Sequence, residues 1–471
     1  MKNYCSPILL ILIFVFCHYR LNAQGYQALH GSPYAGSTAV FNNPAASVNS
    51  AYPWEITLFS AQVKSTTNAF YLKNFSLANQ TNAALTARDG MDTRFEHMNL
   101  DLSLFNFLYK IDKNHAVNFN LRGRTYNHVR MLPFNFIDSS VKDFNSFLIA
   151  NRNTQFIEGY ATHTGWIEAD LNYSQVLMET NHSRLSGGIS LRIMKSVSGV
   201  YAKLNKLSYL EFKNGTDTNY TFTNGTGAVA FSDNYDNTDN VKDFLKRTRT
   251  GLGLNMGLEY LIYNRESDGI SPNNNLNYDW KFGLSIMDIG ATGFSPSAYS
   301  SMYSSPDPTI TDGQLADKIN GAQDIRGLRD SLSTVFTQSI PIADKFSISN
   351  PTRLVLNIDR NLGNHFFVNG ELSLNFFSPN SYTKLRTREL NLLTVTPRWE
   401  TIGFGAYLPV QYTAQGQFWI GAALKTGPLV LGVHNLAIFK QDPYLSGGAY
   451  LMLSIHPFNK TKIINKLDCS N

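Results

Sequence analysis

Charged side chains recur at every second position in several stretches of this sequence. Arg122 and Arg124 are two residues apart, and so are Glu168 and Asp170. The same kind of alternating pattern holds Arg192, Lys281, Asp359 and Glu371, with Asn357 close by. Carboxylate and guanidinium groups at this spacing could bind an ionic ligand, pair with one another, or donate and accept protons. Which of these they do depends on the surface that carries them.

The chain carries none of the common sequence signatures of enzymes. It contains no G-x-S-x-G, no H-E-x-x-H and no phosphate-binding G-x-x-x-x-G-K-[ST] motif. Its ten histidines are scattered without the spacing of metal ligands. We therefore predict that the protein is not an enzyme and has no catalytic residue, no metal and no cofactor.

One acidic stretch could bind a cation. Asp233, Asp236 and Asp239 lie three residues apart within 232–240. The stretch lacks the glycine and the terminal glutamate of a calcium-binding hand. A solvated loop is favoured over a surface calcium site.

The elements that carry the charged residues have a period of two. Apolar and polar residues alternate over about ten positions at 116–124, 166–174 and 252–262, and again around Trp280 and Leu372. This period is typical of β-strands with one face in an apolar medium. Strands of a soluble β-sandwich or propeller, the alternative, are usually nearer five or six residues long.

Composition and length fit a membrane barrel. The 471 residues are 43% hydrophobic, 13% aromatic and only 16% charged, and the mean hydropathy is −0.20. No run of 18 apolar residues follows residue 23. We predict an all-β, antiparallel transmembrane β-barrel of about 14–16 strands, with a short N-terminal hatch and long extracellular loops. The net charge of +5 comes without a Lys/Arg-dense stripe, which argues against nucleic-acid binding.

The N-terminus predicts export. Lys2 precedes the apolar stretch 8–17, which is too short to span a bilayer, and Ala23 is a small residue suited to cleavage. We interpret residues 1–23 as a signal peptide cleaved after Ala23; the alternative is an N-terminal membrane anchor. Cleavage would leave Cys469 as the last cysteine, so no disulfide framework is expected.

The remaining chain divides into three parts. We predict a periplasmic hatch at 24–54, an outer-membrane barrel at 55–458 and a periplasmic tail at 459–471. Sixteen strand cores are predicted, including 183–194, 200–212 and a weak one at 220–231. With this count the longest connections fall on one side of the membrane, the short turns fall on the other, and both termini are periplasmic.

The longest connection is the predicted extracellular insertion 291–351. Apolar residues spaced three or four apart predict a helix over 314–337, although Gly313, Gly321 and Gly327 weaken it. The insertion either caps the outer mouth of the barrel or forms a surface loop with a packed helix.

In such a barrel the alternating charged residues face the lumen. Arg122, Arg124, Glu168, Asp170, Arg192, Lys281, Asp359 and Glu371 would then either line a wet path for a substrate or pair across the lumen and fill it. Glycines within strands, such as Gly188 and Gly253, indicate a bend, a lateral window or ordinary barrel curvature.

Two stretches resemble known barrels. Asn43-Pro44-Ala45, after the predicted signal and before the first strand, resembles the N-terminal segment of the long-chain fatty-acid outer-membrane transporter family and of the related type IX secretion shuttle barrel. The stretches 396–409 and 425–435 resemble an uncharacterised group of Bacteroidota outer-membrane barrels. The first resemblance implies that Asn43, Pro44 and Ala45 belong to a hatch folded into the barrel.

These observations lead to two functional hypotheses. The first is passive passage of a small hydrophobic or amphipathic molecule through the outer membrane. The alternative is a barrel without transport that anchors or shuttles secretion or surface protein partners, as in type IX secretion. Lipid of the outer membrane is the expected surrounding in both.

Overall fold

The computed structural model describes residues 27–74, 84–136, 143–236, 241–263, 277–376, 384–414, 416–439 and 446–457. The predicted signal peptide, its cleavage site, Asp239, most of the connection 264–278 and the tail 459–471 lie outside these residues.

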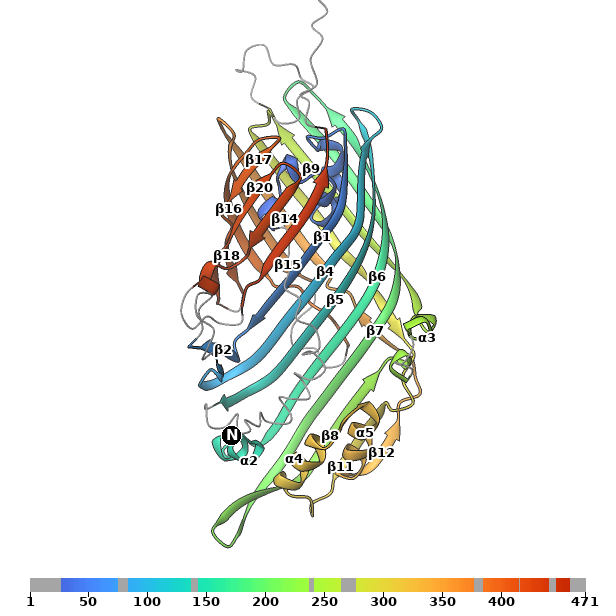
Figure 1. Cartoon of the computed structure of the whole chain (residues 1–471), viewed down its shortest axis with the longest axis vertical. Helices are drawn as coiled ribbons and strands as arrows, with labels where there is room; N and C mark the ends of the chain where they lie inside the picture. The colour runs from blue at the N-terminus through green and yellow to red at the C-terminus, as the bar shows by residue number, and fades with distance from the viewer. Residues whose placement is uncertain are drawn as a thin grey trace, which may run out of the picture.

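The wall of the closed barrel has fourteen antiparallel strand positions (Figure 1). We call each position a stave; a stave is one strand or two short consecutive strands. In order around the wall they are β1 (Trp54–Thr67), β4 (Gly90–Lys110), β5 (His115–Phe136), β6 (Phe156–Glu179), β7 (Ser183–Asn214), β9 (Arg249–Ile262), β10 (Trp280–Phe294), β14 (Arg353–Gly363), β15 (Phe366–Asn375), β16 (Leu392–Glu400), β17 with β18 (Phe404–Tyr407, Val410–Thr413), β19 with β20 (Phe418–Ile420, Ala422–Thr426), β21 (Leu429–Val433) and β22 (Ala449–Ile455). The barrel is closed because β1 pairs with both β4 and β22. The predicted fold class is confirmed.

The period of two separates the two faces of the wall. Outward side chains are large, apolar and exposed, with Leu191 at 61% and Leu252 at 73% of their full accessible surface. The inward neighbours Arg192 and Asn255 are buried. A bilayer requires an apolar outer band on a closed sheet, because closure leaves no strand edge whose backbone groups would face lipid unpaired. Among the described residues, no helix has the length and apolar character to cross a membrane.

The prediction of sixteen separate strands needs correction. The predicted strands 183–194 and 200–212 are one strand, β7, which is 32 residues long. The predicted strand 220–231 exists as β8 (Asp217–Phe231), but it pairs with the outer half of β7, beyond β9, and adds no stave to the wall. A bilayer needs only about 9–11 residues per strand. Beyond it, the ladder of β7 and β8 continues, and its apolar side chains pack on loop elements instead of lipid, so alternation there does not mark a further stave.

A ledge extends the sheet at the end of the barrel that carries the long loops. Its strands are β8, β11 (Ser301–Pro306) and β12 (Phe336–Pro341), and its helices are α2 (Phe144–Ala150), α4 (Asp312–Asn320) and α5 (Ile325–Ser333). Aromatic and aliphatic side chains from these elements form one buried cluster that includes Phe147, Tyr220 and Leu315. Figure 1 shows β8, β11, β12, α4 and α5 at the lower right, with α2 to their left. The predicted helix 314–337 is therefore two helices followed by a strand.

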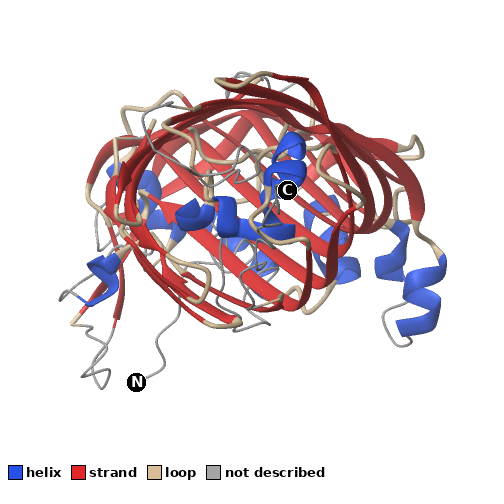
Figure 2. Ribbon diagram, turned by 90° about the horizontal axis from the view of Figure 1, so that it is seen from above, coloured by secondary structure: helices blue, strands red, loops and turns tan. Residues whose placement is uncertain are grey.

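The other described elements are short. They are the hairpin β2 (Phe70–Lys73) with β3 (Ala84–Ala87), β13 (Phe346–Ser349) beside β10, α3 (Val241–Lys246), and the 3₁₀ turns η5 (Asp233–Asp236) and η6 (Leu436–Phe439). Three further 3₁₀ turns, η1 (Gln27–Leu29), η2 (Pro33–Phe41) and η3 (Pro44–Asn49), precede β1. These three turns lie inside the barrel (Figure 2).

Candidate functional site: the hatch and the layers of the lumen

The chain before β1 fills the lumen near the end that carries the short turns. We call residues 27–50 the hatch. Nearly all of its described side chains are buried, and η3 contacts β5, β6, β7 and β9. In Figure 1 it is the dark blue segment within the upper part of the barrel. The predicted range 24–54 ends where β1 begins, at Trp54.

Local sequence signals build the two longer turns of the hatch. Pro33 and Pro44 stand at the first positions of η2 and η3, where a missing N–H costs nothing. The residue before each proline caps the turn: the Ser32 hydroxyl accepts from Tyr34 N at 3.0 Å, and the Asn43 side chain accepts from Ala45 N at 3.0 Å. The Asn-Pro-Ala motif is thus a capped start of η3.

Hydrogen bonds to neutral and to charged groups hold the hatch to the wall on several sides. The Ser37 carbonyl accepts from Asn106 and Asn118, each at 2.9 Å, and the Ser37 hydroxyl donates to the Glu55 carboxylate at 2.8 Å. On the far side, the Asn172 amide donates to the Pro44 carbonyl at 3.2 Å. Each bond between neutral groups contributes only about 0.5–1.5 kcal/mol, because water can replace either partner, and a bond to a charged group contributes about 1.5–3 kcal/mol.

The Asn-Pro-Ala motif rests on a patch of wall without side chains. We call Gly188, Gly257 and Gly283, on β7, β9 and β10, the glycine trough; Gly188 and Gly257 are directly paired. A Cβ atom on Gly188 would lie 2.3 Å from the Pro44 carbonyl carbon. A Cβ on Gly257 would lie 2.1 Å from Asn43 Oδ1. Gly188 is therefore required by the close approach of the hatch backbone, and Gly257 by that of the Asn43 side chain.

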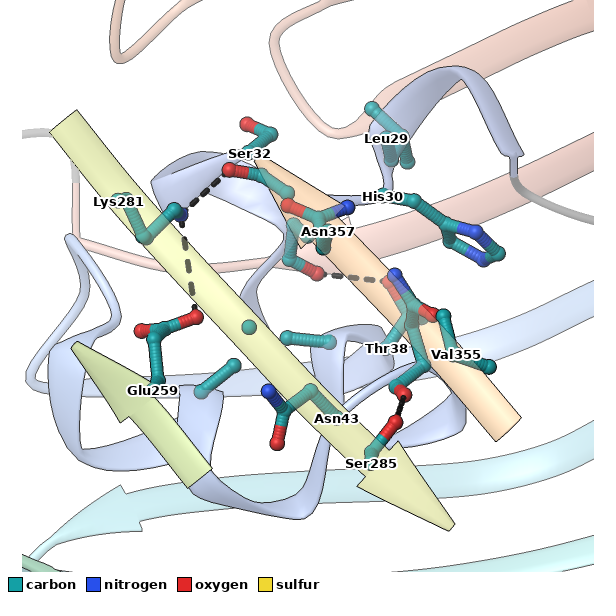
Figure 3. A pocket seen from close by; sticks show the side chains of 16 residues that line it. Leu29, His30, Ser32, Thr38, Asn43, Glu259, Lys281, Ser285, Val355 and Asn357 are labelled. Atoms are coloured by element: carbon teal, nitrogen blue, oxygen red, sulfur yellow. Dashed lines mark hydrogen bonds and ion pairs between the residues drawn. The ribbon is translucent and has the colours of Figure 1, made fainter. Parts of the chain in front are cut away.

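Beside the trough, a narrow pocket separates the hatch from β9, β10 and β14 (Figure 3). Its wall side carries Glu259, Lys281 and Asn357, and its hatch side carries His30 and Asn43. The Lys281 ammonium donates to the Gly31 carbonyl and lies 4.0 Å from Glu259. Lys281, one of the predicted lumen residues, thus contacts the hatch.

On the side of the hatch that faces the long loops, ion pairs cross the lumen. The centre is the Asp288 carboxylate on β10, which lies 2.6 Å from Arg124 of β5, 2.5 Å from Arg192 of β7 and 3.7 Å from Arg353 of β14. All four side chains are shielded from solvent, with Arg353 the most accessible at 12%. Buried charges are stable only when they are paired in this way.

The same layer continues along the wall through Arg122. Its guanidinium lies 2.5 Å from Glu168 and 3.1 Å from Asp101. Asp170 lies 3.9 Å from Arg192. We call the acidic and basic residues of this layer the ion belt; they are Asp101, Arg122, Arg124, Glu168, Asp170, Arg192, Asp288 and Arg353. The belt rests on the hatch, because Arg122 stacks 4.1 Å from the Phe41 ring and Arg353 donates to the Phe41 carbonyl at 3.1 Å.

The remaining predicted lumen residues lie beside the hatch on the opposite wall. Asp359 lies 2.5 Å from Arg398, which also lies 2.8 Å from Glu400. Glu371 accepts from the Asn42 amide at 2.9 Å and is 2.8 Å from His30 Nδ1. Each of these carboxylates is buried against a partner.

An aromatic pair lies next to the ion belt, on the side that faces the long loops. The rings of Tyr126 and Trp166 stack at 5.4 Å, and Met194 completes the cluster. The Arg124 guanidinium lies 5.2 Å and 5.3 Å from the two ring centres. This arrangement buries two aromatic rings next to a cation.

Sequence reasoning missed the centre of the belt. In β10, Trp280, Phe282, Leu284 and Ile286 alternate outward, and the same phase would place Asp288 toward lipid. A bulge between Ile286 and Ile289 shifts the phase, and Asp288 adopts a φ of 61° that directs it inward. A charged residue out of phase with an apolar face is the signal that could have revealed this bulge.

No metal site is formed by the part of the chain that the structure describes, since no group of three or more His, Cys, Asp and Glu side chains converges there. In the acidic stretch, the Asp236 carboxylate accepts from Ser297 and lies 3.9 Å from Arg247.

Comparisons with known proteins place this geometry in context. The chain resembles three solved structures over nearly their whole length. A Pseudomonas aeruginosa FadL homologue is 11% identical, with 92% of this chain and 97% of that chain covered and a TM-score of 0.41. The TodX ΔS2S3 mutant, a monoaromatic hydrocarbon channel, is 10% identical, with 93% and 98% covered and a TM-score of 0.43. The Ralstonia pickettii toluene transporter TbuX is 9% identical, with 92% and 100% covered and a TM-score of 0.41.

Two sequence comparisons were made, one with curated proteins and one with models of protein families. No curated protein matches the chain. The sequence model of the family of unknown function DUF5723 matches residues 44–433, from the proline of the Asn-Pro-Ala motif to the end of β21. The chain therefore belongs to the DUF5723 family.

Proposed function

We propose that this protein is an outer-membrane channel that passes a small hydrophobic or amphipathic molecule passively, and that the hatch is its movable plug. The observation that carries the proposal is the way the hatch is held. It occupies the lumen, and its attachment to the wall is non-covalent throughout: hydrogen bonds to neutral and charged side chains, close contact with the glycine trough, and an apolar cluster around Phe41. When the hatch moves, water can satisfy the polar groups on both surfaces.

The ligand class follows from the layer above the plug. A molecule that reaches the hatch from the long-loop end passes the stacked pair of Tyr126 and Trp166 with Arg124 beneath it. A flat or aliphatic body with one polar end suits such a surface. The ion belt does not prevent passage in principle, because its arginines are long side chains that can repack along the wall without backbone movement.

A reversible lock of the hatch tests the proposal. The hydroxyls of Ser37 in the hatch and Thr57 in β1 lie 2.8 Å apart, so Ser37→Cys with Thr57→Cys is placed to form a disulfide. The background carries Cys469→Ser and lacks residues 1–23. Uptake of a radiolabelled medium-chain fatty acid is measured in vesicles with a lipopolysaccharide outer leaflet. We expect oxidation to reduce uptake at least fivefold and a reductant to restore it.

Each single cysteine variant is the matched control and should not respond to oxidation. Equal uptake by the oxidised and reduced double variant would refute the role of the hatch as a plug. No uptake above protein-free vesicles in either state would refute the transport of this class of molecule.

The alternative, anchoring of protein partners, is favoured by one feature of the ledge. Within the described residues β12 pairs with β11 alone, and its residues 337–341 are exposed. An exposed strand edge can pair with an extended segment of a partner. Recovery of a stoichiometric partner by affinity purification from native membranes, lost on deletion of 336–341, would support this second function.

A further inference from the structure

A segment between β15 and β16 folds into the lumen. Residues 384–391, which we call the strap, are anchored on their own side of the barrel by backbone hydrogen bonds. Thr387 N donates to the Ser349 carbonyl at 3.0 Å, and Ser349 N donates to the Leu385 carbonyl at 3.1 Å. The Asn375 side chain at the end of β15 donates to the Glu389 carbonyl at 2.7 Å.

The strap also contacts the opposite wall. Its Glu389 carboxylate accepts from Asn99 of β4 at 2.7 Å and from the Tyr126 hydroxyl of β5 at 2.8 Å. The Thr162 hydroxyl of β6 donates to the Arg386 carbonyl at 3.3 Å. In the ring of fourteen staves, β4 to β6 stand about half a circumference away from β15 and β16. The strap therefore spans the lumen.

Strand register fixes the depth of the strap. On β4, Asn99 faces the lumen one pleat nearer the long loops than Asp101 of the ion belt. Asn106, two inward positions farther along β4 than Asp101, contacts the hatch. The order from the long loops inward is thus strap, ion belt and hatch.

Two of the three hydrogen bonds to the opposite wall depend on one carboxylate, that of Glu389. Burial alone would raise the pKa of Glu389, but Lys64, Arg353 and His97 hold that pKa below its usual value. The group is therefore charged at neutral pH, and its hydrogen bonds to Asn99 and Tyr126 are charge-assisted. By contrast, the anchored side of the strap has two backbone hydrogen bonds besides the Asn375 side chain, so no single side-chain truncation removes all of its anchors.

We propose that the strap is a second closure of the lumen, on the long-loop side, and that Glu389 is its latch. Loss of the latch leaves the anchored side intact, so the strap can swing toward β15 and β16 while the barrel stays folded. This inference goes beyond the plug role of the hatch. It does not depend on which molecule is transported.

Thiol accessibility tests the strap directly. Ser196 of β7 faces the lumen beside Trp166 and is 1% exposed. It lies two pleats farther from the long loops than Thr162, which contacts the strap. Its hydroxyl has no hydrogen-bond partner in the described part of the chain, so Ser196→Cys is a mild change. In the full barrel with Cys469→Ser and an intact hatch, a membrane-impermeant methanethiosulfonate reagent is added from the long-loop side. We expect Glu389→Ala to raise the labelling rate at least tenfold.

Two further variants separate the latch from general damage. Asn99→Ala removes one donor from the opposite wall and should raise labelling by a smaller factor. Thr394→Ala is the matched control: it is buried on β16 near the strap, and its hydroxyl has no hydrogen-bond partner among the described residues. It should label as slowly as the parent. Heat-modifiable electrophoretic mobility confirms that each barrel is folded.

Unchanged labelling in both Glu389→Ala and Asn99→Ala would overturn the proposal, and so would fast labelling of the parent. If the proposed transport function is wrong but the strap proposal is right, the two experiments give a different combination of results. In that case the hatch lock leaves uptake unchanged, while the Glu389 variant still exposes the thiol.

Discussion

At the scale of single residues, the glycine trough explains why the hatch fits the wall. A β-branched or even a methyl side chain at Gly257 or Gly188 would occupy the space of Asn43 or Pro44. Glycine is costly in a strand, since it offers no side chain to pack. Its presence on three adjacent strands at the point of closest approach indicates a site shaped for the Asn-Pro-Ala motif.

We therefore predict that Gly257→Ala displaces the hatch. Overpacking of this kind costs about 1–3 kcal/mol, which corresponds to roughly a 5- to 150-fold shift toward the displaced state. The measurement is the rate at which a protease added from the short-turn side cleaves the hatch in the folded barrel, and that rate should rise. Gly123→Ala is the control, because its added Cβ would meet no atom within 4 Å. Equal cleavage of the two variants would contradict this role of the trough.

At the scale of elements, strand length is set by two different requirements. The apolar face of each stave ends at the membrane surface, whereas the hydrogen-bonded ladder of β4 to β7 continues beyond it. The ledge is built on this continuation, with Tyr209, Tyr220 and Phe222 in its core. The wall and the ledge should therefore unfold separately.

Deletion of the hairpin tip 206–224 tests this separation. The deletion removes Tyr209, Tyr220 and Phe222 from the ledge but leaves the pairing of β7 with β9 untouched. We expect α4 and α5 to become sensitive to protease while the barrel keeps its heat-modifiable mobility. A deletion of equal length that removes 183–201 from the wall should abolish that mobility. Loss of the barrel in the hairpin deletion would show that the ledge is part of the wall's folding unit.

The same distinction explains what the sequence predicts and what it does not. Alternation at 116–124 and 166–174 reveals lumen-facing charges because the bilayer imposes an apolar opposite face. It cannot count staves through 200–231, because the apolar side chains there pack on the ledge instead of lipid, and their alternation does not mark a stave of the wall. Asp288 escapes prediction because one bulge reverses the phase of β10. The strap escapes because Glu389 is 290 residues from Asn99 and 263 residues from Tyr126 in the chain, and no local pattern records such contacts.

At the scale of the whole molecule, three layers close one lumen, and they differ in what must move to open them. The hatch and the strap are backbone segments, whereas the ion belt consists of side chains on the wall. A belt arginine can change rotamer without loss of wall pairing. The hatch and the strap therefore determine whether the lumen is open, and as closures in series each should block it alone.

This series arrangement predicts a non-additive result in planar-bilayer conductance. Deletion of residues 24–52 removes the hatch, and Glu389→Ala releases the strap. Each change alone should leave steady conductance close to that of the parent, because the other closure remains. Together they should give a steady pore, at least tenfold more conductive than either single variant. Full conductance from the hatch deletion alone would mean that the strap does not seal the lumen. A silent double variant with confirmed insertion would mean that the ion belt itself seals it, and the arginines around Asp288 would then be the gate.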